Sequence, residues 1–209
     1  MDDKQYLQSL ISQGEHQQQD FKYKVQDAIK LAKSVSAFAN TDGGRLLIGV
    51  RDDGNISGVR SEEEIYMMHA AAYKYCKPEA KIGFETLHAN GRTVVIATVP
   101  PAKRKPVYAL DDKGARTAYV RIKDENIVAS PVYLEIWRQD AMAQSMMHYT
   151  DTEQRLMEVM RDNPSTTLNR IVGLSRQGRH HVIGTLARLI RYGVVNVEYV
   201  DMKFLFSLA

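Results

Sequence analysis

Residues 36–50 read SAFANTDGGRLLIGV, and this stretch decides the fold of the first part of the chain. It begins inside a pattern of apolar positions, three and four residues apart from Val25 to Phe38, which predicts an amphipathic helix. Gly43 and Gly44 end this helix, because glycine readily adopts the left-handed conformation common at helix ends. The apolar run from Leu46 to Val50 then predicts a short buried strand. A helix that turns at once into a buried strand indicates a mixed α and β structure.

The segments around this stretch complete an α+β domain that we expect over residues 1–130. Asn90-Gly91 joins two apolar runs and is a strong signal for a hairpin turn. The alternation of helices and strands favours an α+β architecture. The further elements expected here are helices at 3–12 and 61–76 and strands at 20–23, 56–59, 81–88, 93–99, 107–110 and 117–123.

A different pattern begins near Tyr149. Short helices are expected at 151–161, 166–172 and 176–192, followed by strands at 194–199 and 204–208. Three helices and a β-hairpin in this order predict a small winged helix-turn-helix domain over residues 150–209. Pro131 suits the first turn of a helix, so we expect a connecting helix over residues 131–149.

The composition is that of an ordinary globular protein, with 44% hydrophobic and 25% charged residues in 209. It excludes a disordered tail, a collagen-like repeat and a disulfide scaffold. No apolar run approaches the roughly 20 residues of a membrane-spanning helix, and no signal peptide is recognised, so we expect no membrane partner. The single Cys76 suits a reducing compartment, and we expect a cytoplasmic location.

The basic excess is small in total but uneven along the chain. The net charge is only +3, yet residues 176–191 hold four Arg and two His and no acid. A helix in the major groove needs cations for phosphates and Arg or Gln for base edges. The early residues of such a helix face the bases, so we expect DNA contacts from Ser175, Arg176, Gln177, Arg179, His180 and Arg188. A solvated basic face on a protein-interaction module is the alternative.

In the first domain, Lys22 and the run Lys103-Arg104-Lys105 are basic enough to touch a phosphate backbone. Scattered lysines also serve solubility, which is the plainer interpretation. No GxxxxGK[ST] sequence occurs, and the Gly43-Gly44 loop follows a helix rather than a strand. We therefore expect no nucleotide cofactor.

One acidic constellation could carry chemistry. Glu15, Asp20 and Asp52, with Asp53 adjacent, could hold Mg²⁺ or Mn²⁺ for phosphodiester cleavage if they converge. By itself Asp52-Asp53-Gly54 is equally a turn, and Asp20 equally a residue at a strand edge. Spacing alone does not choose between these interpretations.

Several of these segments together resemble the Schlafen AlbA-like domain over residues of about 10 to 130. They are Glu15, Asp20-Phe21-Lys22, the 36–44 stretch, Leu46–Val50, Asp52-Asp53-Gly54, Val99-Pro100, Lys105–Tyr108 and Tyr119-Val120-Arg121. In bacteria this domain is commonly joined to a C-terminal winged helix and described as a DNA-binding transcriptional regulator. The resemblance therefore implies a DNA-binding regulator without chemistry of its own, and with no metal or cofactor. We expect a homodimer, because symmetric dimers suit paired half-sites.

The same resemblance implies an alternative. Eukaryotic relatives include RNA endonucleases that use three acidic residues, and the matching positions here are Glu15, Asp20 and Asp52. Asp20 departs from the pattern, which usually carries the longer Glu. The alternative function is thus a divalent-metal-dependent endoribonuclease with RNA as its partner.

Overall fold

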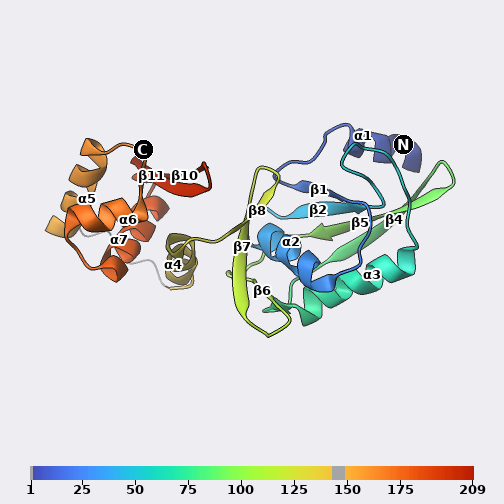
Figure 1. Ribbon diagram of the computed structural model, residues 1–209, viewed down its shortest axis with the longest axis horizontal. Helices are drawn as coiled ribbons and strands as arrows, with labels where there is room; N and C mark the ends of the chain where they lie inside the picture. Colours follow the sequence, from blue (N-terminus) through green and yellow to red (C-terminus); the bar gives the residue numbers. More distant parts are fainter. Residues whose placement is uncertain (1, 143–148) are drawn as a thin grey trace. The chain divides into compact units, whose positions relative to one another are not determined.

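The computed structural model describes residues 2–142 and 149–209, and the chain divides into two compact units, Met1–Val128 and Ala129–Ala209 (Figure 1). Each unit has a hydrophobic core of its own. The mixed α+β class expected from the sequence is confirmed. No helix in the described ranges is both long and apolar enough to cross a membrane.

The first unit is built on a four-stranded sheet in the order β1-β2-β5-β4. β1 and β2 are parallel, whereas the other pairs are antiparallel. The strands are β1 (Gln19–Lys22), β2 (Gly44–Ile48), β4 (Gly83–Ala89) and β5 (Arg92–Val99). The helices that accompany this sheet are α1 (Asp3–Ile11), α2 (Ala28–Asn40) and α3 (Ser61–His69). The π-helical turn Ala70–Lys74 follows α3 directly.

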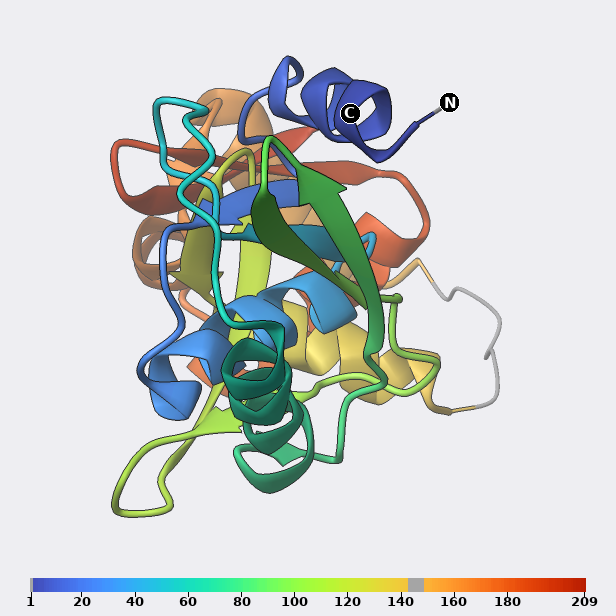
Figure 2. The same ribbon diagram turned by 90° about the vertical axis from the view of Figure 1, so that its right-hand side faces the viewer.

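Helices cover both faces of this sheet, α1 on one side and α2 on the other (Figure 2). Successive side chains of a strand point to opposite faces. Leu46 and Ile48 accordingly pack in the core with α2, while Leu47 packs with Leu7 and Leu10 of α1. The continuous apolar run in β2 is therefore explained by burial on both faces.

A second sheet, in the order β3-β6-β7-β8, packs against α2 as well. Its antiparallel strands are β3 (Cys76–Lys77), β6 (Tyr108–Leu110), β7 (Arg116–Ile122) and β8 (Glu125–Val128). Asn40 ties the helix to this sheet: its Nδ2 donates to the carbonyls of Val107 and Tyr119, both at 2.9 Å, and its Oδ1 accepts from the Val107 N–H at 2.7 Å. The Ser36 hydroxyl donates to the same Val107 carbonyl.

The two glycines after α2 are required by close packing as well as by the turn. Gly43 has φ +73°, a conformation that suits glycine. A Cβ atom at Gly44 would lie 2.3 Å from the ring of Phe38. Gly43 and Gly44 therefore end the helix and also allow the chain to pack closely against it.

In the second unit, residues 129–142 and 149–209 form four helices and a small antiparallel sheet in the order β10-β11-β9. Its core contains Val132, Leu156, Ile171, Leu186 and Phe206. The elements are α4 (Pro131–Asp140), α5 (Asp151–Asp162), β9 (Thr166–Thr167), α6 (Leu168–Ser175), α7 (Arg179–Arg191), β10 (Val195–Val200) and β11 (Lys203–Leu208).

Three local expectations differ from the structure. Residues 56–59 form only an isolated bridge between Ile56 and Val50, because Gly54 before this segment and Gly58 within it have positive φ. The helix expected at 176–192 is α7, which begins at Arg179, because Arg176 adopts a left-handed conformation. α4 packs against α7 within the second unit, and residues 143–148 of the segment expected to connect the domains lie outside the described residues.

We predict that Asn40→Ala lowers the free energy of unfolding by about 3 kcal/mol, because it leaves buried backbone groups of the second sheet without partners. Urea unfolding followed by circular dichroism measures this change. Asp42→Ala, an exposed change in the same turn, serves as the control and stays within about 0.5 kcal/mol of the parent. A loss below about 1 kcal/mol for Asn40→Ala would contradict this role of the amide.

Candidate nucleic-acid interface

The first turn of α7 is basic, exposed and uncapped. Gly178 is the N-cap residue and supplies no side-chain hydrogen bond. Arg179, His180 and His181 follow it, all of them exposed, and the turn contains no acid. Helix N-termini carry partial positive charge and free N–H groups, and normally attract acidic side chains. This turn therefore gathers positive charge in a place where that charge costs stability.

In this turn Arg179 and His181 contact neutral groups, whereas His180 interacts electrostatically with the carboxylate of Glu135 on α4. Arg179 donates from Nη1 to Asn169 Oδ1 at 2.7 Å, and the His181 Nε2 lies 3.3 Å from the Thr152 hydroxyl. Both partners are neutral. Arg170 of α6, also exposed, likewise contacts a neutral amide, that of Asn163. These neutral contacts orient the side chains without neutralising the guanidinium groups.

The later arginines of α7 are neutralised by acids from other helices. Arg188 pairs with Glu153 of α5, whose side chain is only 2% exposed, and Arg191 pairs with Asp140 of α4 at 2.6 Å. The absence of acid within α7 concealed these pairs from the sequence analysis. Arg188, expected to contact DNA, is thus paired with Glu153 in the structure and joins α7 to α5.

The turn before α7 holds the other expected readers. Ser175 is the last residue of α6 and is buried, and its hydroxyl donates to the Val172 carbonyl. Arg176 is exposed in a left-handed conformation with φ 56°, and Gln177 is half-buried. Of these three side chains, that of Arg176 is open to a ligand, whereas that of Ser175 is a structural part of the turn.

The tip of the β10–β11 hairpin carries an exposed apolar side chain, that of Met202, which the sequence analysis did not predict. Its two-residue tip, Asp201-Met202, has positive φ at both positions, the geometry of a tight hairpin turn. The Met202 side chain is 86% exposed, and Lys203 beside it is exposed too. Neither tip residue is a glycine, so the usual sequence signal for this turn is missing.

In the first unit, the expected phosphate contacts differ in availability. Lys22 forms a 2.6 Å ion pair with Asp20, and the Lys105 Nζ donates to the Thr41 carbonyl at 3.1 Å. Lys103 and Arg104 are exposed beside a cleft of about 440 Å³. Two of the four expected cations are thus occupied within the fold.

The three acidic residues of the nuclease alternative do not assemble into a metal site. Glu15 and Asp20 are neighbours: burial raises the pKa of the Glu15 carboxyl, and the adjacent Asp20 raises it further. Asp52 lies exposed in the turn after β2. Within residues 2–142 and 149–209, no three His, Cys, Asp or Glu side chains gather closely enough to hold a metal ion.

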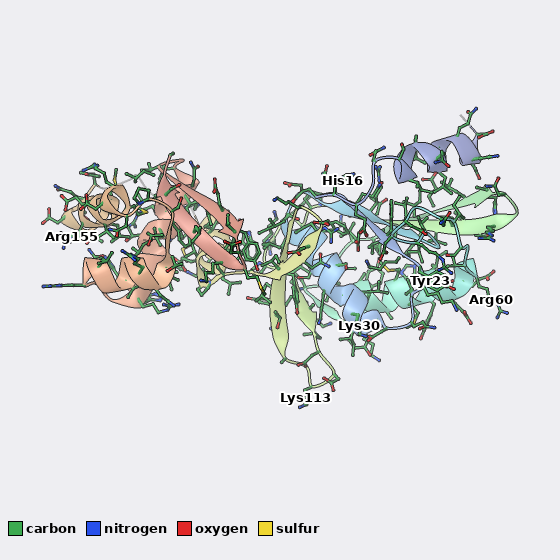
Figure 3. The ribbon with its side chains drawn as sticks, turned by 45° about the horizontal axis from the view of Figure 1, so that its top comes forward. His16, Tyr23, Lys30, Arg60, Lys113 and Arg155 are labelled. Carbon is green, nitrogen blue, oxygen red and sulfur yellow. The ribbon has the colours of Figure 1, made fainter. Side chains whose placement is uncertain are left out.

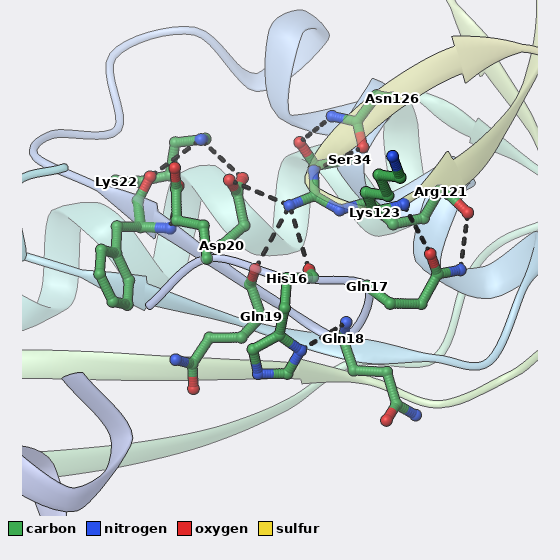
Figure 4. Close-up of polar contacts among 12 residues, drawn as sticks. His16, Gln17, Gln18, Gln19, Asp20, Lys22, Ser34, Arg121, Lys123 and Asn126 are labelled. Atoms are coloured by element: carbon green, nitrogen blue, oxygen red, sulfur yellow. Dashed lines mark hydrogen bonds and ion pairs between the residues drawn. The ribbon is translucent and has the colours of Figure 1, made fainter. Parts of the chain in front are cut away.

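The guanidinium of Arg121 in β7 lies beside the Asp20 carboxylate and supplies a positive charge to this buried group (Figure 4). Its side chain is 1% exposed, and Nη2 lies 3.3 Å from Asp20 Oδ1. The guanidinium also donates to Asn126 Oδ1 and to the carbonyls of His16 and Gln19. The Asp20 carboxylate is therefore held between two protein cations, Arg121 and Lys22, which explains why it does not join a metal-binding group.

Comparisons with known proteins agree with the first unit. A family model described as Schlafen, AlbA_2 matches residues 15–130, more than half of the chain. The comparison with curated proteins found no match.

Two solved structures are similar to the chain. The DIP2311 protein of Corynebacterium diphtheriae is 20% identical with a TM-score of 0.47, over 75% of this chain and 32% of that chain. The N-terminal domain of a RecG-related protein from Nitrosomonas europaea is 21% identical with a TM-score of 0.42, over 72% of this chain and 99% of that chain. This chain matches about a third of the length of the DIP2311 protein.

We predict that Arg121→Met lowers the free energy of unfolding by about 3–5 kcal/mol, because it leaves Asp20 buried with one cation fewer. Urea unfolding measures the loss, and adding Asp20→Asn to the same variant recovers part of it by removing the buried charge. Lys123→Met, an exposed change two residues later in the connection between β7 and β8, is the matched control. Equal stability of Arg121→Met and Lys123→Met would refute the role given to the buried pair.

Proposed function

We propose that this chain, which belongs to the Schlafen AlbA_2 family, is a DNA-binding transcriptional regulator that contacts DNA through its second unit. In this proposal α5, α6, α7 and the β10–β11 hairpin form a winged helix-turn-helix. The observation that carries the proposal is the first turn of α7, where exposed basic side chains and free backbone N–H groups occur together. That combination suits phosphate oxygens and base edges.

In this proposal the two ends of α7 have different roles: the first turn contacts DNA, and the last turns hold the helix in place. Arg179 and His180, at its exposed start, enter the major groove, and Arg176 in the preceding turn contacts a phosphate. Arg188 and Arg191, paired with Glu153 and Asp140, hold the helix against the rest of the unit. The reading end is thus separate from the anchoring end.

The β10–β11 hairpin acts as the wing in this proposal. Lys203 is placed to meet a phosphate beside the groove, and the exposed Met202 is an apolar side chain of the kind that minor-groove proteins insert at base steps. This role gives a reason for a strongly exposed methionine at a tight turn.

In this proposal the first unit contacts the sugar-phosphate backbone of DNA, and these contacts do not depend on base sequence. Lys103 and Arg104 are its exposed candidates, since Lys22 and Lys105 are engaged within the fold. Two copies of the chain, paired symmetrically, would present two reading helices to two half-sites. We place this homodimer in the cytoplasm, where the DNA of a bacterial cell lies.

We predict that Arg179→Ala weakens specific DNA binding by about 1–3 kcal/mol and leaves the fold intact, because its side chain is exposed and donates to an exposed amide. Fluorescence anisotropy against genomic fragments at several salt concentrations measures both the affinity and the salt slope. Arg155→Ala on α5, which breaks an exposed pair with Glu158, is the control and should change little. Unchanged affinity and slope in Arg179→Ala would rule out α7 as the reading helix.

A further inference from the structure

The first unit contains a polar cleft of about 560 Å³. It is formed by the segment before α3, the first turn of α3 and the β4–β5 turn. Three cationic side chains line it, Lys24, Arg60 and Arg92, together with the carboxylates of Glu63 and Glu64. Figure 3 draws Arg60 extending outward from the start of α3. Its volume is in the range of ordinary small-molecule sites, but its lining is far more charged.

Glu64 is the unusual member of this cleft. The residue is only 6% exposed, and its Oε2 is buried with no hydrogen-bond partner among the described residues. Burial raises the pKa of this carboxyl and Glu63 raises it further, while Lys24 and Arg60 act in the opposite direction. A buried acceptor without a donor costs free energy. The side chain is therefore suited to a donor that the protein itself does not supply.

The three cations of the cleft are free of close carboxylates. Within the described residues, none of them lies within 4 Å of an acidic oxygen. The Arg92 guanidinium donates to the Ile56 carbonyl, and the Lys24 ammonium lies 5.6 Å from the centre of the Tyr23 ring. Their positive charge thus remains available to an anion, since these contacts do not neutralise it.

The buried carboxylate of Glu64 and the three cations together restrict the chemical class of ligand that the cleft can bind. An anion without a hydroxyl, such as sulfate, would satisfy the cations but leave Glu64 without a donor. A metal ion would satisfy Glu64 but meet three positive side chains. A molecule that carries both a phosphate and a hydroxyl satisfies both, because a phosphate pairs with Lys and Arg and a hydroxyl donates to a carboxylate.

We propose that this cleft binds a phosphorylated sugar, with the phosphate at Lys24, Arg60 and Arg92 and a sugar hydroxyl donating to Glu64. This ligand chemistry has two sources, a free sugar phosphate and the 5′-phosphorylated end of a ribonucleotide strand. The proposal is independent of DNA binding by the second unit, since every residue it uses lies in the first.

Isothermal titration calorimetry on the full chain tests the proposal with ribose 5-phosphate, inorganic sulfate and ribose as separate probes. We expect ribose 5-phosphate to bind at least about tenfold more tightly than sulfate, because its hydroxyls add a hydrogen bond to a charged acceptor and sulfate has no donor. Equal binding of the two, or no binding of ribose 5-phosphate, would overturn the proposal. A 5′-phosphorylated oligoribonucleotide in a parallel titration identifies the source: tighter binding than ribose 5-phosphate assigns the site to a strand end, and weaker binding to the free compound.

The variants separate the two halves of the site. Glu64→Gln should lower the preference for ribose 5-phosphate over sulfate by about tenfold, whereas Glu62→Gln, which removes the same charge from an exposed residue of the same helical turn outside the cleft lining, should leave the preference unchanged. Arg60→Ala should weaken both probes alike. An undiminished preference in Glu64→Gln, with the fold verified by circular dichroism, would refute the role of this carboxylate. Arg179→Ala should bind the sugar phosphate normally, so a failure of DNA binding is distinguished from a failure at this cleft.

Discussion

The first unit depends on one buried charge pair, the guanidinium of Arg121 beside the carboxylate of Asp20. Arg121 comes from the second sheet, Asp20 from the first, and the ring of Phe38 on the intervening helix α2 lies 5.1 Å from the guanidinium carbon. Because a buried charge without its partner is very costly, the two sheets are fixed in one arrangement around α2. The hydrogen bonds of Asn40, two residues after Phe38, join the same end of this helix to the second sheet, and the two contacts together define the geometry of the unit.

The elements of this unit were predictable where local patterns determine them. The helix before Gly43, the buried strand after it and the Asn90-Gly91 hairpin follow from periodicity and turn chemistry, and all three are present in the structure. The partners of single side chains were not predictable in this way. Asp20 reads as a candidate metal ligand in the sequence, because nothing within a hundred residues of it announces that Arg121 will lie against it.

The same limit applied to the candidate interface. The run of arginines in α7 is visible in the sequence, but the acids that neutralise two of them, Glu153 and Asp140, come from other helices. Only tertiary packing separates the anchoring arginines from Arg179. Likewise, Glu64 reads as one of three glutamates at a helix start, and its unusual burial depends on the surrounding loops. Charge sums along a segment therefore overestimate the charge that a ligand meets.

The uncapped, basic start of α7 has a consequence for the thermodynamics of the second unit. The guanidinium of Arg179 lies at the positive end of the helix dipole and no acid offsets it in the first turn, so the free unit gives up stability that an acidic first turn would have supplied. An anion bound there removes that penalty. By linkage, whatever occupies this helix end stabilises the folded unit in proportion to how tightly it binds, so the unit would be most resistant to heat and proteolysis in its occupied state.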